Sequence, residues 1–390
     1  MPLDLGLVSE GLEEMARALS QGVKGQEIER ARLLLRETDP DNLRAKIEAA
    51  KTSWLLAWPE NSLSGAYPAP EPPLNFSVVA TDGSYISPDR HIPVRFVVIN
   101  IGSALLTYGD DPMAHLESKS HLYFREEELR IPHPFKELYL EGEFLGARRT
   151  VLELEALVKV AAQGVKPVVG LQDGSLILWG LPTTDDPDDI SVRDHFLRPF
   201  LGALQKLRAQ GIPVASYLSQ PQSKDVVNSL RVEICDNEPV NCDKCSYVAQ
   251  RLRLTCSDLA GILDREIFAS LKPGERSDIY KGSSKILRAG YGEHWIYFFY
   301  LNVGQEIVRL EFPQWVARDE ERLNLLQALV YDQCQRGRGY PSALQEAHEQ
   351  AVITGPERRV VESLVEEALA REGVVLARSG KATSKKERGV

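Results

Sequence analysis

The sequence lacks the features that would direct a chain to a membrane or out of the cell. Its first residues, MPLDLGLVSEGLEEM, contain no basic stretch followed by an apolar one, as a signal peptide requires. No uninterrupted apolar run reaches the roughly 18 residues of a membrane span. The longest run, FVVINIGSALL at 96–106, is rich in β-branched residues and predicts a buried strand. We therefore expect a cytoplasmic protein with no membrane partner.

Cysteine is scarce, with five residues in 390, and in a reducing compartment disulfides are not expected. Four of the five nevertheless fall close together in a C-x6-C-x2-C-x10-C pattern, formed by Cys235, Cys242, Cys245 and Cys256. Such a set can give four thiolates to a structural Zn²⁺, or to an iron–sulfur cluster, or it can be four ordinary thiols. The spacing favours a metal and does not choose between zinc and iron. Cys334 stands apart and is expected in the core.

Positive charge is also in short supply, since the formal net charge is −10. Proteins that bind nucleic acid tightly by themselves usually gather Lys and Arg into a patch. The only clear basic run lies at 378–388, which is typical of a solvated terminal tail. The Walker A pattern G-x-x-x-x-G-K-[ST] is missing as well, so any motion driven by ATP must come from a partner.

What is present is an ordinary globular composition, 43% hydrophobic and 26% charged. Apolar residues recur at helical spacing through the first 57 residues, including the stretch NLRAKIEAAKTSWLLAW at 42–58. We predict five regions in chain order: an N-terminal helical segment at 1–57, a proline-rich linker or extended crossing segment at 58–74, a main domain at 75–370, a cysteine-bearing insertion within it at 235–256, and a flexible basic tail at 371–390.

The main domain opens with three β segments, a helix and a fourth strand. These are, in order, NFSVVATDGSYI with a turn at Asp82-Gly83, RFVVINIGSALLTYG, SHLYFREEELRIP, the helix ELYLEGEFLGARRTVLELEALVKVAAQG and VKPVVGLQDGSLILWG. This order predicts an α/β fold of the ribonuclease-H-like class, with a mixed central sheet flanked by helices. That fold places an Asp in the first strand, a Glu on the first helix and an Asp at the end of the fourth strand. Here these positions hold Asp82, Glu153 or Glu155, and Asp173.

Further along, a helix is expected at 194–210, a strand at 212–219, and helices from about Asp319 onward. Between them, HWIYFFYLNVG and EIVRLEFPQW predict two amphipathic strands. Arg309 and Glu311 alternate with apolar residues in the second of these, a pattern typical of an ion pair on the surface.

The two Asp-Gly-Ser sequences are the strongest candidates for chemistry. One Asp-Gly at a strand end is usually only a turn, but two of them, each after an apolar strand, favour a site for two Mg²⁺ or Mn²⁺ ions. Ser84 and Ser175 would hydrogen-bond the neighbouring carboxylate or a phosphate. Periodicity does not separate Glu153 from Glu155, because both flank the apolar stripe of the helix.

A third candidate region is GRGYPSALQEAHEQAVI. His348 lies four residues after Leu344 and four before Val352, so we expect it to face inward with the apolar side. It is then either a core histidine, or a metal ligand or general acid near the leaving group. Tyr340 would bind or orient a phosphate.

Together, TDGSYI, LQDGSLI, FFYLNVG-EIVRLEFPQW and GYPSALQEAHEQAVI resemble the NurA nucleases over about residues 75–365. The resemblance implies a homodimeric, Mn²⁺- or Mg²⁺-dependent DNA nuclease, a 5′–3′ exonuclease with endonuclease activity a further expectation. It also implies a HerA-type hexameric translocase as partner in double-strand-break repair. By motif, Asp82, Asp173 and the helix Glu would bind metal, with Tyr340 and His348 serving the second metal or the scissile phosphate. A translocase that pushes DNA into the nuclease would explain the acidic net charge. The alternative is a non-catalytic clamp that threads DNA for a translocase.

Overall fold

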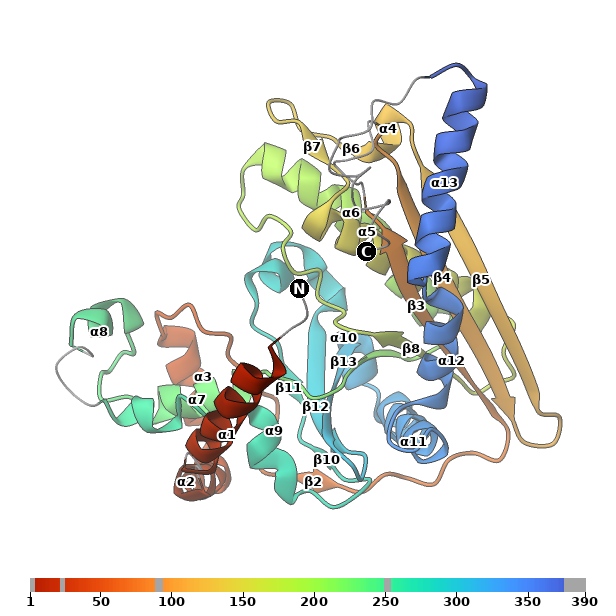
Figure 1. The fold of residues 1–390 in the computed structure, drawn as a ribbon. Coiled ribbons are helices and arrows are strands. Elements are labelled where there is room, and N and C mark those ends of the chain that lie inside the picture. The colour runs from red at the N-terminus through yellow and green to blue at the C-terminus, as the bar shows by residue number, and fades with distance from the viewer. Residues whose placement is uncertain (1–3, 22–24, 88–93, 249–253, 375–390) are drawn as a thin grey trace. The chain divides into compact units, whose positions relative to one another are not determined.

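The computed structural model describes residues 4–21, 25–87, 94–248 and 254–374, and these form two compact units (Figure 1). Unit 1 comprises residues 1–65 and 221–270, and unit 2 comprises residues 66–220 and 271–390. The division falls inside the proline-rich segment and joins the cysteine-bearing region to the N-terminal helices. The basic run at 378–388 lies outside the described residues. None of the described helices is long and apolar enough to cross a membrane.

Unit 1 is mainly helical. The helix α3 begins with Asp39 as its N-cap and Pro40 in its first turn, and packs against α7, where Lys46 pairs with Glu233 at 3.0 Å. The helix expected to continue through Trp58 ends at Ala49. The elements of unit 1 are α1 (Leu5–Gln21), α2 (Gly25–Glu37), α3 (Pro40–Ala49), β1 (Trp58–Pro59), α7 (Asp225–Glu233), α8 (Cys242–Val248), η1 (Thr255–Leu259), α9 (Asp264–Ile267) and η2 (Phe268–Ser270).

Unit 2 is built on a mixed sheet whose strands follow the order β11-β12-β13-β9-β8-β3-β4-β5. β3 is antiparallel to β4, and β4 to β5, whereas β8 runs parallel to both β3 and β9. The strands of unit 2 are β2 (Ala66–Tyr67), β3 (Phe76–Ile86), β4 (Val97–Tyr108), β5 (Met113–Tyr123), β6 (Arg130–Ile131), β7 (Leu138–Tyr139), β8 (Val168–Asp173), β9 (Val214–Leu218), β10 (Arg276–Ser277), β11 (Tyr280–Lys281), β12 (Ile296–Asn302) and β13 (Ile307–Pro313).

Helices cover both faces of this sheet. α5 packs on β3, β4 and β8, while α12 packs on β3, β4 and β5. The helices of unit 2 are α4 (Glu126–Leu129), α5 (Gly142–Ala161), α6 (Pro187–Gln210), η3 (Leu287–Tyr291), η4 (Gly292–His294), α10 (Gln314–Ala317), α11 (Glu320–Arg336), α12 (Ser342–Ala351) and α13 (Gly355–Arg371). The order of three antiparallel strands, a helix and a parallel fourth strand confirms the expected ribonuclease-H-like fold.

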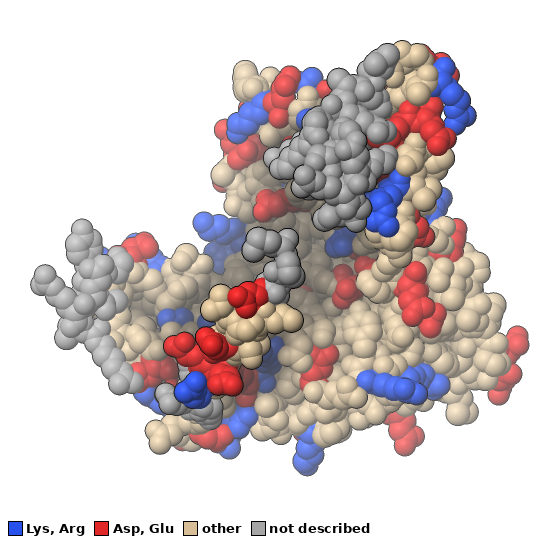
Figure 2. Space-filling model, in the orientation of Figure 1, with Lys and Arg blue, Asp and Glu red and all other residues tan. Residues whose placement is uncertain are grey.

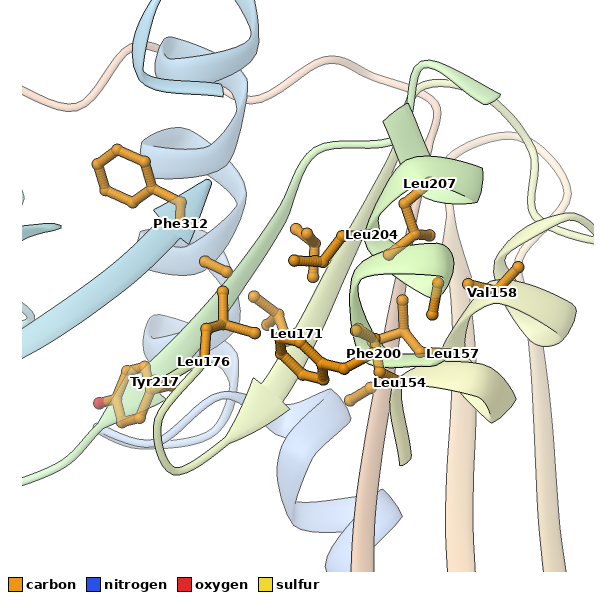
Figure 3. Close-up of a cluster of buried hydrophobic side chains, with 14 of the residues drawn as sticks. Leu154, Leu157, Val158, Leu171, Leu176, Phe200, Leu204, Leu207, Tyr217 and Phe312 are labelled. Atoms are coloured by element: carbon orange, nitrogen blue, oxygen red, sulfur yellow. The ribbon is translucent and has the colours of Figure 1, made fainter. Parts of the chain in front are cut away.

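The core of unit 2 lies between the sheet and the helices α5 and α6. Figure 3 shows Leu154 and Leu157 of α5 and Leu204 and Leu207 of α6 among the buried side chains. Leu157 lies over Gly170 of β8, where a Cβ would come within 2.7 Å of it. Leu154, Leu157 and Leu171 are fully buried, as the apolar periodicity of the helix and the strand predicts. This packing fixes the helix that bears the candidate glutamates against the strand that bears Asp173.

Three local predictions are wrong. Asp82-Gly83 is not a turn, because β3 continues to Ile86 and pairs with β4 along its whole length. The strands β12 and β13 are not amphipathic, since nearly every side chain on both of their faces is buried. Arg309 and Glu311 consequently form a buried ion pair, 4% and 2% exposed, rather than a surface pair. Cys334 lies in the core as expected.

Candidate active site

The site lies in unit 2, where β3 and β8 separate. These parallel strands are paired from Ser77↔Val168 to Thr81↔Gln172. Beyond that point β8 ends at Asp173, and a left-handed Gly174, with φ of 85°, turns the chain away. β3 continues through Asp82. The last residue of β8 and the residue of β3 just beyond the pairing therefore lie at the opening between the strands.

Asp82 and Asp173 share one face of the sheet. Side chains alternate between faces along a strand, and Gly102, which pairs with Asp82, faces the backbone of α12. In β8, Gly170 faces α5, so Asp173 points to the opposite face, the one that α12 covers. The pKa of Asp173 is raised by partial burial and by the negative charge of Asp82. The two carboxylates therefore repel each other, which is the condition that a cation between them would relieve.

His348 joins this pair from α12. Its Nδ1 lies 2.6 Å from Oδ2 of Asp82. The imidazole is 61% exposed, so the prediction that His348 faces inward is wrong. The buried positions of this helix are Ala343, Leu344, Ala347 and Ala351, and His348 lies beside that stripe. The histidine is a surface residue that contacts a carboxylate, and not a core histidine.

Tyr340 precedes α12 and points to the second carboxylate. Its hydroxyl lies near enough to Asp173 for that carboxylate to raise the pKa of the phenol, and its ring packs edge-on against Tyr217 with centroids 5.3 Å apart. Burial, together with the charges of Asp173 and Asp82, raises the pKa of Tyr340. The phenol therefore stays protonated at neutral pH and acts as a hydrogen-bond donor.

Glu153 approaches the same place from the other face. A Cβ on Gly83 would lie 2.6 Å from Oε1 of Glu153 and 2.8 Å from Cγ of Arg149. The glycine therefore leaves the space that the glutamate fills, and explains why Asp-Gly occurs here inside a strand. Oε2 of Glu153 accepts from Nε2 of Gln172 at 2.8 Å, whereas Oε1 has no hydrogen-bond partner.

The environment of Glu153 favours its protonated form. The carboxyl is 1% exposed, and burial raises its pKa to about 7, against the opposing effects of Arg149 and Gln172. Asp82 and Asp173 add to the increase. Nε of Arg149 lies 3.3 Å from Oε1, and its Nη1 donates to the carbonyl of Gly83 at 3.0 Å. Near neutral pH this glutamate is thus poised between its two forms.

Glu155 is placed elsewhere. It lines a small cavity of about 110 Å³ with Ser103, Lys119 and His121 of β4 and β5. Of the two glutamates that periodicity left tied, only Glu153 lies beside the aspartates. Arg149 and Gln172 were not predicted, although one precedes Glu153 by a helical turn and the other precedes Asp173 by one residue.

Neither serine of the two Asp-Gly-Ser sequences hydrogen-bonds a carboxylate of the site. Ser84 Oγ donates to the carbonyl of Ala351 at the end of α12. Asn100 Nδ2 donates to the same carbonyl at 2.9 Å. Ser175 Oγ donates to Glu311 at 2.6 Å. The predicted hydrogen bond to the neighbouring Asp carboxylate is therefore wrong for both serines, and each instead fixes a neighbouring segment.

Gly102 determines how closely α12 approaches the sheet. A Cβ there would lie 2.2 Å from the carbonyl of Ala347 and 2.4 Å from the amide of Ala351. We expect Gly102→Ala to push α12 outward, lower the free energy of unfolding by about 1–3 kcal/mol, and separate His348 from Asp82. The midpoint of thermal unfolding would measure this loss of stability. Gly202→Ala on α6, where a Cβ meets nothing within 4 Å, should leave the stability unchanged or raise it. Equal midpoints for both variants would contradict this reading.

The comparisons with known proteins agree with this arrangement. The NurA domain model matches residues 76–353, which include all of the candidate residues just described. The chain belongs to the NurA domain family. A search of curated proteins found no match.

Solved structures that resemble this NurA-domain chain are distant. A crystal structure of NurA with manganese has 12% identity and a TM-score of 0.38, covering 92% of this chain and 98% of that one. The catalytic domain of human Endonuclease V has 12% identity and a TM-score of 0.30, covering 91% and 98%. Drosophila Piwi has 9% identity and a TM-score of 0.28, covering 70% and 29%.

The four clustered cysteines of the NurA-domain chain lie in unit 1, at the end of α7, in α8 and in η1. Asn237 Nδ2 donates to Sγ of Cys245 at 3.1 Å. Burial and the neighbouring Cys235 and Cys242 raise the pKa of Cys245, which favours its thiol form. Within the described ranges, no group of three or more His, Cys, Asp or Glu side chains is arranged to hold a metal ion. The expected zinc or iron–sulfur site is therefore not supported by the structure.

The carboxylates of the candidate active site also do not form a complete set of metal ligands. Asp82 is bound to His348, and Glu153 lies on the opposite face, so three carboxylates do not converge as a finished ligand set. The donors nevertheless fit a hard divalent cation. They offer the two mutually repelling carboxylates of Asp82 and Asp173, and a buried Glu153 oxygen that accepts no hydrogen bond and lies 3.3 Å from Arg149.

Proposed function

We propose that this chain is a divalent-metal-dependent DNA nuclease. The observation that carries the proposal is the meeting of Asp82, Asp173, Tyr340 and His348 at the opening between β3 and β8, from three segments far apart in sequence. Membership of the NurA domain family supports it. The carboxylate donors suit Mn²⁺ or Mg²⁺, and we infer two ions.

Each residue has a role that follows from its contacts. Asp82 and Asp173 would hold the ions, and Glu153 would join them in its ionised form. Bound there, the ions supply an activated water and a Lewis acid at the scissile phosphate. The exposed imidazole of His348 can reach a phosphate or donate a proton to the leaving oxygen. The protonated Tyr340 orients Asp173 through its hydroxyl.

The charge distribution bears on how DNA reaches this site. On the face shown in Figure 2, Lys and Arg are interspersed with Asp and Glu rather than gathered into one basic field. The net charge is −10. We infer that DNA is delivered by a HerA-type hexameric translocase, that the chain works as a homodimer, and that it processes ends 5′ to 3′ in double-strand-break repair.

The test is cleavage of end-labelled single- and double-stranded DNA by the purified chain, with Mn²⁺ or Mg²⁺, and with and without the ATPase. We expect cleavage with Mn²⁺ that a chelator abolishes and that the ATPase stimulates on duplex ends. A non-catalytic clamp is the second candidate, since no ready-made ligand set is found among the described residues. DNA binding without cleavage under every condition would favour the clamp.

A further inference from the structure

The segment that follows Asp173 is anchored to a buried carboxylate two strands away. Ser175 Oγ donates to Oε2 of Glu311 at 2.6 Å, and the amide of Leu176 donates to the same oxygen at 3.2 Å. The amide of Ile177 in turn donates to Ser175 Oγ at 3.0 Å. These bonds fix the chain within four residues of the catalytic candidate, just after the left-handed turn at Gly174.

The Glu311 carboxylate is itself held in place by Arg309. Oε1 of Glu311 accepts from Nε of Arg309 at 3.1 Å, and the guanidinium of Arg309 lies 3.6 Å from the centroid of the Phe298 ring. Both charges are at least 95% buried. A buried ion pair costs desolvation and is tolerated when its remaining polar contacts are satisfied. Here Ser175 and Leu176 make the remaining contacts of the Glu311 carboxylate that the structure shows.

The sheet register aligns Glu311 with Gln172, the residue that contacts Glu153. Glu311 of β13 pairs with Ser216 of β9, and Ser216 pairs with Gln172 of β8. Paired residues share a face, so these three side chains form one buried polar row. At one end Gln172 holds Glu153, and at the other Glu311 holds the turn after Asp173. The small Ser216 between them lets Glu311 reach across β9.

We propose that Glu311 is a positioning residue for Asp173. By fixing Ser175 and Leu176 it sets the course of the chain as it leaves β8, and so keeps the Asp173 carboxylate turned toward Asp82 and Tyr340. This inference rests on the proposed function, because it concerns how well the site binds its cation. Glu311 does not touch the reacting atoms, and acts through the segment that it holds.

The first test uses the full-length chain and the single change Ser175→Ala, which removes the hydroxyl and leaves the buried ion pair intact. We expect the Mn²⁺ concentration for half-maximal cleavage to rise about 10-fold, with KM for DNA unchanged. In metal-free protein, amide hydrogen–deuterium exchange across 174–179 should accelerate while exchange in α5 and β3 stays as in the parent.

A second variant, Glu311→Gln, removes the charge and keeps the shape. It should raise the half-maximal Mn²⁺ concentration about 10–100-fold. Combining it with Ser175→Ala should add little to that increase, because both variants weaken the contact between Ser175 and Glu311. The matched control is Glu293→Gln, which removes an exposed pair with Arg208 and should behave as the parent. If Glu311→Gln does not fold, Ser175→Ala decides.

The outcomes separate this inference from the function it rests on. If the parent cleaves DNA with Mn²⁺ but Ser175→Ala keeps the parental Mn²⁺ dependence and exchange pattern, the positioning role is overturned. If the parent never cleaves, the nuclease proposal fails. Exchange at 174–179 still reports in that case whether Glu311 and Ser175 fix this segment, and unchanged exchange would overturn the inference without reference to activity.

Discussion

Asp82→Asn should reduce Mn²⁺-dependent DNA cleavage by at least about 1000-fold, equivalent to about 4 kcal/mol of transition-state stabilisation. The change removes one negative charge at the point where β3 and β8 separate, and preserves the shape of the side chain. Because Asp82 raises the pKa of Asp173, the variant loses a repulsion and should unfold no earlier than the parent in metal-free buffer. Initial rates on end-labelled DNA, with thermal unfolding of the same preparation, give both quantities.

The control for this result is Glu155→Gln. Glu155 lies two residues from Glu153 on α5 but lines a different cavity, near His121 of β5. We expect its cleavage rate to stay within about twofold of the parent, since it touches none of the site residues. Asp173→Asn should match Asp82→Asn. Parental cleavage by the Asp82 variant, with the same Mn²⁺ dependence, would mean that the site is elsewhere.

The topology of unit 2 could be predicted because its signals are local and repeated. Apolar runs of strand length, one helix with a clear apolar stripe and two Asp-Gly-Ser sequences gave the order of the elements, and that order was sufficient for the fold class. Leu154 and Leu157 are buried as their spacing indicates. The strand that ends at Asp173 was also predicted, because the left-handed Gly174 follows it.

The predictions that failed depend on neighbours that the sequence does not name. Asp82-Gly83 is typical of a turn, but Gly83 lies within β3 because Glu153 fills the space of its missing side chain. Arg309 and Glu311 alternate as in an exposed strand, yet Ser175 and Leu176 contact Glu311, and Arg309 lies against the ring of Phe298. Whether such a pattern is exposed depends on which segments cover that face of the sheet.

His348 and Glu153 illustrate the same limit on helices. Spacing placed His348 with Leu344, but the buried stripe of α12 is narrow and passes through Ala347 instead. The two glutamates of α5 are equivalent by periodicity. Only the packed structure shows that one meets Gly83 and Gln172 while the other turns toward β5.

Glu153→Gln should abolish most cleavage and yet stabilise the metal-free protein at alkaline pH. The folded-state pKa of Glu153 is about 7, above the ordinary 4.5. Its contribution to stability is therefore fully present below about pH 4.5 and is lost as the pH rises through 7. The cost of ionising the buried carboxyl then reaches up to about 3 kcal/mol. Glutamine does not titrate, so the variant escapes this cost.

The measurement is thermal unfolding of parent and variant in chelator from pH 5 to pH 8.5. The gap between the two midpoints should be small at pH 5, widen as the pH rises to about 7 and level off above that value, with the variant higher by about 2–4 °C for each kcal/mol. Glu155→Gln should show no such divergence. Mn²⁺ should narrow the gap by stabilising the parent, because a cation favours the ionised glutamate and binds the folded state. A variant that is less stable than the parent at every pH would contradict this prediction. It would show that the Glu153 carboxylate stabilises the metal-free fold through Arg149 and Gln172.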